Sequence, residues 1–192
     1  MRLLLLLYPA LLAAQTLTLT GPANVRPGQT ADVTATLAGT GAVGLQWSVA
    51  IPPQLGNATA TTPLSDKTLH RSTDGTLHLL VGLNVTPIAP GVVAKYALSI
   101  PANAPKGVYQ MPLTGLLAAD ANGDAITLTS GPAYSLRVLA RSDLNGDGLT
   151  NGADLTLMID QVLGRTACAD DQTGDGKCNL MDVLAVVRDA LQ

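Results

Sequence analysis

The chain has 192 residues, enough for one ordinary domain and a small second one. It carries 14 Asp and no Glu against 11 Lys and Arg, which gives a formal net charge of −3. The acid is concentrated near the carboxyl end, where nine Asp and three basic residues follow from Asp143 onward; the preceding part has five Asp and eight basic residues. A nucleic-acid partner would call for clustered basic residues, so this distribution argues against one.

Residues 1–15 predict a secretory signal peptide. A single basic residue, Arg2, precedes a run of leucines, and small residues end the segment, so cleavage is expected near Ala14 or Gln15. The run is too short to span a bilayer, and no later stretch is long and apolar enough to form a transmembrane segment. We therefore expect a secreted protein in an oxidising compartment with ample calcium.

Residues 16–140 predict an all-β domain. Stretches rich in Thr, Val and Ala alternate in polarity, and clusters of Gly, Pro, Asn and Asp separate them at the spacing of a sandwich or barrel. Trp47 falls on the apolar side of its strand, which predicts a place in the core. The runs near 79–83 and 116–119 are apolar on both sides, as in central strands. The candidate strands are Thr16–Thr20, Thr30–Ala38, Val43–Ile51, Leu77–Leu83, Val92–Ile100, Tyr109–Leu117, Ala125–Thr129 and Tyr134–Leu139.

The twelve residues from Asp143 to Asp154 have the spacing of a calcium loop. Oxygen-bearing side chains occupy positions 1, 3, 5, 9 and 12, and Gly148 stands at position 6, where such loops turn sharply. Position 7 needs only its backbone carbonyl, and Asp in place of Glu at position 12 is the one departure. The proposed ligands are Asp143, Asn145, Asp147, Leu149, Asn151 and Asp154.

The same pattern returns 28 residues later. The second set of ligands is Asp171, Thr173, Asp175, Lys177 through its carbonyl, Asn179 and Asp182. An apolar helical stripe follows each loop at the same offset: Leu155, Met158, Ile159, Val162 and Leu163 match Val183, Val186, Val187, Ala190 and Leu191. These matches predict a duplicated loop–helix unit with two Ca²⁺ sites; the alternative is a pair of turns that cap two helices. Thr173 offers only a neutral hydroxyl, so the second site is expected to be weaker or to use a water as ligand.

The run DLNGDGLTNGADLTLMIDQVLG, followed by DQTGDGKCNLMDVLAVVRDAL, resembles a dockerin, a calcium-dependent module that binds cohesin domains. The resemblance covers residues 141–192 and implies two repeats, 143–164 and 171–191, related by pseudo-two-fold symmetry. It also implies that loop positions 10 and 11 and the following helix contact the partner. Those residues are Gly152, Ala153, Ile159 and Asp160 in the first repeat and Leu180, Met181, Val187 and Arg188 in the second. The second set is more apolar and is expected to be the main docking face; the alternative is that it packs against the sandwich or the first helix.

Residues 16–140 resemble a cohesin domain in the stretches VGLQWSVAIPPQL, LLVGLNVTPIAPGVVAKYALSIP and GVYQMPLTGLLAADANGDAITLTSG. The resemblance implies a nine-stranded, jelly-roll or immunoglobulin-like β-sandwich, one face of which can bind a dockerin. Carbohydrate-binding modules share this architecture, so the fold alone does not assign a function.

Cys168 and Cys178 are the only cysteines. In an exported chain, an even pair so close in sequence predicts a disulfide that pins the second loop. Two free thiols or an intermolecular bridge are the alternatives.

Taken together, these patterns predict a secreted, non-catalytic scaffold or adaptor that assembles with cohesin- or dockerin-bearing proteins in a polysaccharide-degrading or cell-surface complex. No nucleophile–base pair, phosphate-binding loop or transition-metal cluster is visible in the sequence, so no enzymatic activity is expected. Having both modules on one chain permits head-to-tail self-association. Polysaccharide is expected to be contacted only indirectly; the alternative function is a carbohydrate-binding sandwich carried by a dockerin.

Overall fold

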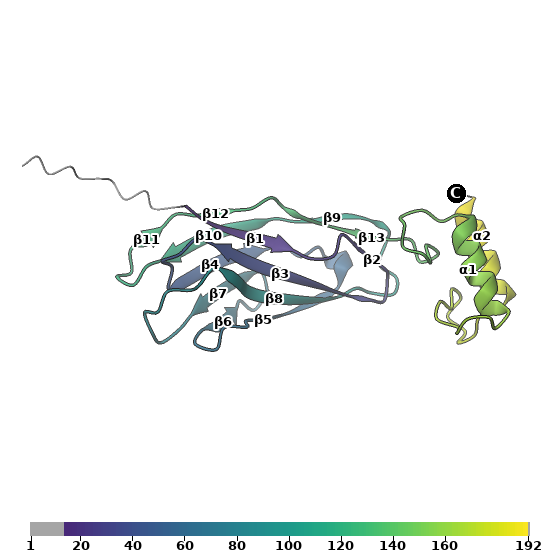
Figure 1. Cartoon of the computed structure of the whole chain (residues 1–192), viewed down its shortest axis with the longest axis horizontal. Helices are drawn as coiled ribbons and strands as arrows, with labels where there is room; N and C mark the ends of the chain where they lie inside the picture. Colours follow the sequence, from purple (N-terminus) through teal and green to yellow (C-terminus); the bar gives the residue numbers. More distant parts are fainter. Residues whose placement is uncertain (1–13, 192) are drawn as a thin grey trace, which may run out of the picture.

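The computed structural model describes residues 14–191, which form an elongated β-sandwich followed by two helices (Figure 1). Residues 1–13 of the predicted signal peptide, which covers residues 1–15, lie outside the described part, and the first strand starts at Gln15. The strands are β1 (Gln15–Thr20), β2 (Asn24–Val25), β3 (Thr30–Ala38), β4 (Gly44–Val49), β5 (Asn57–Thr61), β6 (Thr68–Arg71), β7 (Leu77–Val81), β8 (Gly91–Ser99), β9 (Gly107–Met111), β10 (Leu113–Ala119), β11 (Ala125–Ile126), β12 (Leu128–Ser130) and β13 (Tyr134–Val138). A short 3₁₀ turn covers Pro53–Leu55, and the helices are α1 (Gly152–Val162) and α2 (Leu180–Ala190).

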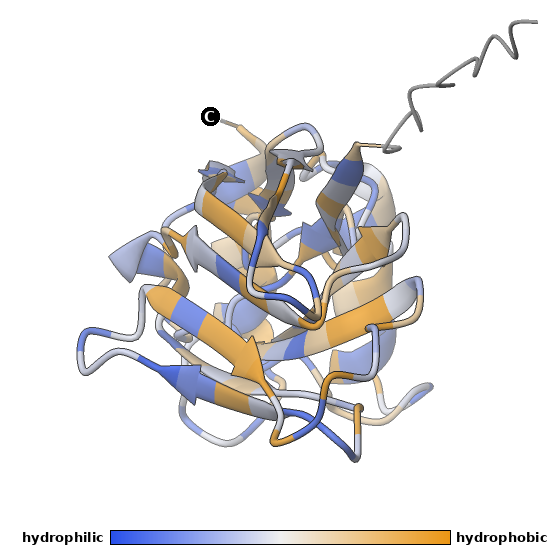
Figure 2. Ribbon diagram, turned by 90° about the vertical axis from the view of Figure 1, so that its left-hand side faces the viewer, coloured by the Kyte–Doolittle hydropathy of each residue, from blue (hydrophilic) through white to orange (hydrophobic). Residues whose placement is uncertain are grey.

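Two five-stranded sheets form the body of the sandwich. Their strand orders are β12-β1-β3-β8-β5 and β11-β10-β4-β7-β6, and a smaller sheet of order β2-β13-β9 lies at the end nearer the helices (Figure 1). Figure 2 looks along the sandwich and shows hydrophobic and hydrophilic residues alternating along its strands. The predicted β-sandwich is therefore confirmed.

Strict alternation of polarity builds the core. Strand β3 has the bounds that its sequence predicts, and its side chains at every second position from Ala31 to Leu37 are buried. On β4, Leu45, Trp47 and Val49 point inward, and Trp47 is fully buried, as predicted. Successive side chains of a strand point to opposite faces, so this register leaves the intervening polar side chains on the outside.

The predicted strand Tyr109–Leu117 is wrong as a single element, because Pro112 divides it. Strand β9 ends at Met111 and pairs with β13, whereas β10 begins at Leu113 and pairs with β4 in a different sheet. Proline has no backbone N–H to give to a ladder, so a strand that passes from one sheet to another accommodates it at the point of crossing. The predicted Ala125–Thr129 strand is also divided, at Thr127: β11 pairs with β10, whereas β12 pairs with β1. The described residues therefore contain more strands than the nine expected.

Three strands escaped prediction, and two apolar runs are more exposed than expected. Strands β2 (NV), β5 (NATAT) and β6 (TLHR) lie at sheet edges and are short or consist mostly of small or polar residues. Strand β7 does lie between β4 and β6, but its Leu79 is 39 % exposed, and Leu117 on β10 is 59 % exposed. The prediction that both faces of these runs are buried is therefore wrong, because their outer faces are exposed.

The two helices share a small core of their own. Met158 of α1 and Val186 of α2 are fully buried, and Leu144 packs with them, together with the half-buried Leu155 and Val183. The predicted apolar stripes are only partly buried, since Ile159, Leu163 and Leu191 are exposed. A core this small contributes little stability, so the loops and the disulfide carry much of the order in this module.

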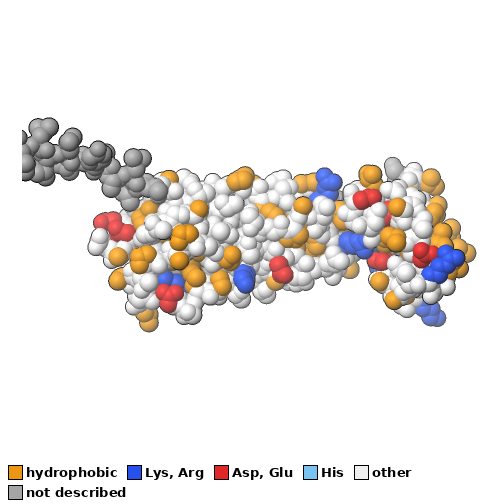
Figure 3. All heavy atoms as spheres, viewed as in Figure 1, with side chains coloured by type: hydrophobic (Ala, Val, Ile, Leu, Met, Phe, Trp, Pro, Cys, Tyr) orange, Lys and Arg blue, Asp and Glu red, His pale blue; other side chains and the backbone are white. Residues whose placement is uncertain are grey.

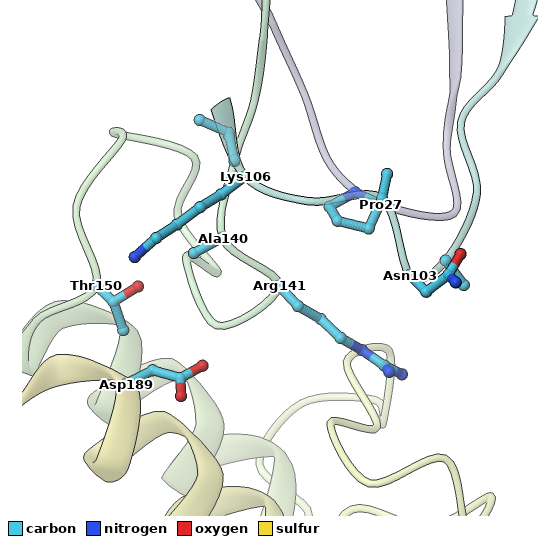
Figure 4. Close-up of a pocket in the computed structure, with 10 residues that line it drawn as sticks. Pro27, Asn103, Lys106, Ala140, Arg141, Thr150 and Asp189 are labelled. Carbon is cyan, nitrogen blue, oxygen red and sulfur yellow. The ribbon is translucent and has the colours of Figure 1, made fainter. Parts of the chain in front are cut away.

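An ion pair joins the sandwich to the helical module: Arg26 pairs with Asp170 (Nη1 to Oδ1, 3.1 Å). The segment that connects the two is held to the helical module, since Arg141 donates to the carbonyl oxygen of Asp171 at 2.6 Å and the fully buried Ser142 donates to Asp189 at 2.8 Å. A pocket of about 350 Å³ remains between the two modules, with Lys106, Arg141, Thr150 and Asp189 among its lining residues (Figure 4). No helix within residues 14–191 has the length and apolar character to cross a bilayer.

Candidate functional site

The first acidic loop is organised around the carboxylate of Asp143. Its two oxygens accept hydrogen bonds from the backbone N–H groups of Gly146 and Gly148, each at 2.8 Å. Both glycines have positive φ angles, +78° and +94°, a backbone region that favours glycine. The glycines at positions 4 and 6 therefore let the chain wrap around the carboxylate at position 1.

The middle of this loop is held by Asp147. Its carboxylate accepts from the N–H of Leu149 and from the side-chain amide of Asn145, both at 2.8 Å. These bonds, that from Leu149 first, hold the pKa of Asp147 below its ordinary value, because they favour the ionised form.

Asp154 closes the loop and begins α1. It is fully buried and accepts from the N–H groups of Leu144, Asn145 and Asn151 at 2.7, 3.0 and 2.9 Å. The side chain of Asn151 in turn accepts from the N–H of Ala153 at 2.8 Å. Asn151 and Asp154 therefore form a capping box at the start of α1. One carboxylate thus joins the start of the loop to the start of the helix.

The second loop repeats these bonds position by position. Asp171 accepts from Gly174 and Gly176, both at 2.6 Å, and Asp182 accepts from the N–H groups of Gln172, Thr173 and Asn179 at 2.8–2.9 Å. The bond from Gly176 contributes most to lowering the pKa of Asp171. Burial by itself would raise the pKa of Asp182, but its N–H bonds outweigh that effect and lower it.

The two loops differ at position 3. In the first loop, the Asn145 amide donates to Asp147. In the second loop, the Thr173 hydroxyl donates to Asp182 at 3.1 Å and to Asp171 at 3.2 Å. The oxygen proposed as a ligand at this position is therefore bonded to two of its neighbouring carboxylates.

The donor set of each loop fits a hard cation by its chemistry: three carboxylates, a backbone carbonyl and neutral side-chain oxygens. Within residues 14–191, no three His, Cys or Asp side chains lie close enough together to form a metal-binding group. The two metal sites predicted from the sequence therefore remain predictions.

The predicted disulfide is present. Cys168 and Cys178 are joined and close a loop with a sequence separation of 10. Gln161 of α1 reinforces the same segment, because its side-chain oxygen accepts from the N–H groups of Ala169 and Asp170 at 2.9 and 3.0 Å. The approach to the second loop is thus tied both covalently and to the first helix.

Most of the predicted docking residues are accessible. In the second repeat Leu180 is 66 % exposed and Met181 is 59 % exposed, Arg188 is exposed and Val187 is half-buried. The first repeat leaves Gly152, Ala153 and Ile159 exposed and Asp160 half-buried. Leu184, 51 % exposed, extends the apolar surface along α2. Leu180 and Met181 are therefore not packed against the sandwich or against α1. Figure 3 shows hydrophobic side chains together with charged ones on the helical module.

A second apolar surface lies on the sandwich, where no site residue was predicted. Leu79 of β7, Gln46 of β4 and Leu117 of β10 are register neighbours and form a row across the outer face of the sheet. They line a shallow groove with Val81 and Ala119. The two-sided apolar runs in the sequence indicate this surface, but they predict burial within the sandwich instead of exposure.

The described residues show no aromatic platform of the kind that stacks on sugars. Trp47 is fully buried, Tyr96 is 2 % exposed and Tyr134 is 8 % exposed, while Tyr109 is half-buried. The indole N–H of Trp47 instead donates to the hydroxyl of Tyr96 at 2.7 Å, so this polar group has a hydrogen-bond partner inside the core. No observation favours a glycan-binding function for the sandwich.

No protein-family model matches the chain, and no curated protein matches it. Among solved structures, the chain is similar to a non-cellulosomal cohesin from the hyperthermophilic archaeon Archaeoglobus fulgidus. The identity is 10 %, the TM-score is 0.49, and the match covers 69 % of this chain and 96 % of that one. It is also similar to the CARDB domain of a Pyrococcus furiosus protein, solved with di-metal ions, at 12 % identity and a TM-score of 0.32 over 65 % of this chain and 87 % of that one. Both likenesses are too distant to bear on function.

Proposed function

We propose that this chain is an exported, non-catalytic adaptor with two calcium-binding loops. Its helical module docks on a cohesin-bearing protein, and its sandwich receives a dockerin-type helical module. The observation that carries the proposal is the repeated bonding of the two loops. At equivalent positions, Asp143 and Asp171 are wrapped by two glycine N–H groups, and Asp154 and Asp182 each accept three backbone N–H bonds. A chance pair of helix caps would not share the whole pattern.

Calcium would be held by the six ligand positions of each loop and would supply positive charge that offsets two of the three carboxylate charges. The chain contributes the alignment: backbone N–H groups fix the carboxylates at positions 1 and 12, and the capping boxes start both helices directly from the loops. Binding and helix formation are then coupled, because an ion held by the loop also stabilises the helix that begins in it.

The two apolar surfaces supply the contacts with partners. Leu180, Met181 and Leu184 form an exposed edge on α2 that burial against a partner would remove from water. The Leu79–Gln46–Leu117 row lines a shallow, uncharged groove of the kind that receives a helix, so we assign it to the incoming helical module.

Calcium titration of the full chain tests the metal half of the proposal. Calorimetry should resolve two sites, the second weaker, and circular dichroism should show a gain of helix that chelator reverses. Replacement Asp154→Ala should abolish the tighter site. The matched control Asp124→Ala, in the sandwich, should leave both sites unchanged. Heat and helicity that do not respond to Ca²⁺ would refute this half.

Affinity capture in calcium, followed by elution with chelator, tests the docking half. The variants Leu180→Asp and Met181→Asp should lose the captured partner while they keep both calcium sites. Leu83→Asp places the same charge at a fully exposed leucine of the sandwich and serves as the control. Light scattering of the purified chain identifies the partner as a second copy if the mass rises with calcium. Capture that is unchanged in both helix variants would remove α2 from the interface.

A further inference from the structure

Lys67 is the only lysine buried within residues 14–191, and it lies outside the helical module and the apolar row. Its side chain is 1 % exposed, and its Nζ donates to the side-chain oxygen of Asn84 at 2.7 Å and to the carbonyl oxygen of Thr86 at 2.8 Å. Burying an amine costs free energy that surface lysines do not incur, and these hydrogen bonds offset part of that cost.

The amide of Asn84 is oriented by three further contacts. Its Oδ1 accepts a second hydrogen bond, from the N–H of Thr86 at 3.1 Å. Its Nδ2 faces the Asp66 side chain, with Oδ2 at 3.4 Å, and also donates to the Asp66 carbonyl oxygen at 3.3 Å. The same Oδ2 lies 3.6 Å from Nζ of Lys67. A single carboxylate oxygen thus stands next to both the amine and the amide nitrogen.

This arrangement has the parts of an acyl-transfer site. Lys67 supplies a nucleophile, the side-chain carbonyl of Asn84 is the electrophile, and the N–H of Thr86 is aimed at the oxygen on which charge would develop. Since Nζ is 2.7 Å from Oδ1 and a C=O bond is about 1.23 Å long, Nζ lies at most about 3.9 Å from the carbon it would attack. Bonds form from separations of about 3–3.5 Å, which lie close to this upper limit.

We propose that Lys67 and Asn84 join in an intramolecular isopeptide bond, with Asp66 as the proton carrier. Asp66 takes one proton from the Lys67 ammonium, and the neutral Nζ forms a bond to Cγ of Asn84. The bond from Cγ to Nδ2 then breaks, and Nδ2 receives through Asp66 the second proton that Nζ sheds. The products are a secondary amide and ammonia, which leaves with the remaining proton as ammonium; no oxidant or cofactor is consumed.

The surroundings suit this reaction. Asn84 is exposed, so ammonia passes directly into solvent. Gly82 lets the two loops approach, because a Cβ at that position would collide with the carbonyl oxygen of Asp66. The bond would tie the start of edge strand β6 to the loop that follows β7 and would stop that edge from peeling away.

Intact mass and peptide mapping of the full chain test the proposal. The chain should weigh less than its sequence, after allowance for the disulfide and for the observed amino terminus, by one ammonia molecule. Trypsin should fail to cut after Lys67, and the peptide that contains it should be linked to residues 72–95, the fragment that holds Asn84. The mapping is essential because cyclisation of an amino-terminal glutamine, or of an asparagine that precedes glycine, loses the same mass.

Three variants separate the chemistry from simple packing. Lys67→Arg and Asn84→Ala should each have the mass of the unlinked chain, and Asp66→Asn should remain unlinked although the amine and the amide are both present. Asp74→Asn, in the exposed turn between β6 and β7, should form the link as the wild type does. Fluorescence of Trp47 checks that each variant is folded. A folded wild-type chain cut normally after Lys67 would overturn the proposal, and a link retained in Asp66→Asn would overturn the role of that carboxylate.

Discussion

His78 should make the sandwich less stable in mild acid. The imidazole is fully buried, stacks on Trp47 with ring centroids 5.5 Å apart, and meets Tyr96 edge-on at 5.2 Å. Its Nδ1 lies 3.1 Å from the carbonyl oxygen of Thr76, while its Nε2 has no hydrogen-bond partner. Burial, together with the positive charge of Arg71, lowers the pKa of His78 from 6.5 to about 4, because the core disfavours the imidazolium.

The direction and size of the effect follow from this pKa. The unfolded chain protonates His78 near pH 6.5 and the folded chain only near pH 4, so the stability is complete above 6.5 and falls as the pH drops between these values. The full difference corresponds to about 3 kcal/mol at the acid limit, and about 2 kcal/mol of it should be lost between pH 7 and pH 5.

Urea unfolding measures this loss, since the fluorescence of Trp47, the only tryptophan, reports on the sandwich alone. The variant His78→Phe keeps an aromatic ring against Trp47 but cannot be protonated. Between pH 7 and pH 5 it should therefore lose about 2 kcal/mol less stability than the wild type. His70→Gln alters an exposed histidine and should behave as the wild type does. Equal losses in wild type and His78→Phe would show that His78 is not the group responsible.

Three further outcomes are expected. Replacing Asp182 with Ala leaves three loop N–H groups without their acceptor and should cost at least about 2 kcal/mol in the helical module, seen as lost helicity; Asp124→Ala should cost nothing measurable there. Reducing the disulfide should destabilise the second loop by about 3 kcal/mol and weaken its calcium site more than the first, as calorimetry would show; equal weakening would refute the link. Arg26→Ala removes the ion pair with Asp170 and should increase the radius of gyration in X-ray scattering, whereas Lys95→Ala should not.

The elements that the sequence predicts best are those in which one pattern decides the structure. Strict alternation determines β3 and the burial of Trp47, and the offset between the two loops anticipates the same glycine N–H bonds to the carboxylate at position 1 of each. Edge strands β5 and β6 were missed because they need no large apolar residues. Their existence depends on pairing with β8 and β7, which no local pattern reveals.

Long-range contacts were beyond prediction for a related reason. Arg26 and Asp170 are 144 residues apart, and nothing near either residue indicates the other. Lys67 and Asn84 meet because β6 and β7 pair, and the sequence shows neither that pairing nor the burial of a lysine. For Leu79 and Leu117 the sequence predicts burial, but both side chains are exposed. An apolar run has the same pattern whether its side chains pack inside the molecule or against a partner.

The crossing at Pro112 has a mechanical consequence. The segment from Gly107 to Ala119 belongs to the small sheet on one side of the proline and to the β4 sheet on the other, so it connects the two sheets covalently. Tension applied through the helical module enters β13, passes to β9 and continues through the same segment into β10. A chain pulled at that end would therefore load the small sheet and the β4 sheet through one continuous segment.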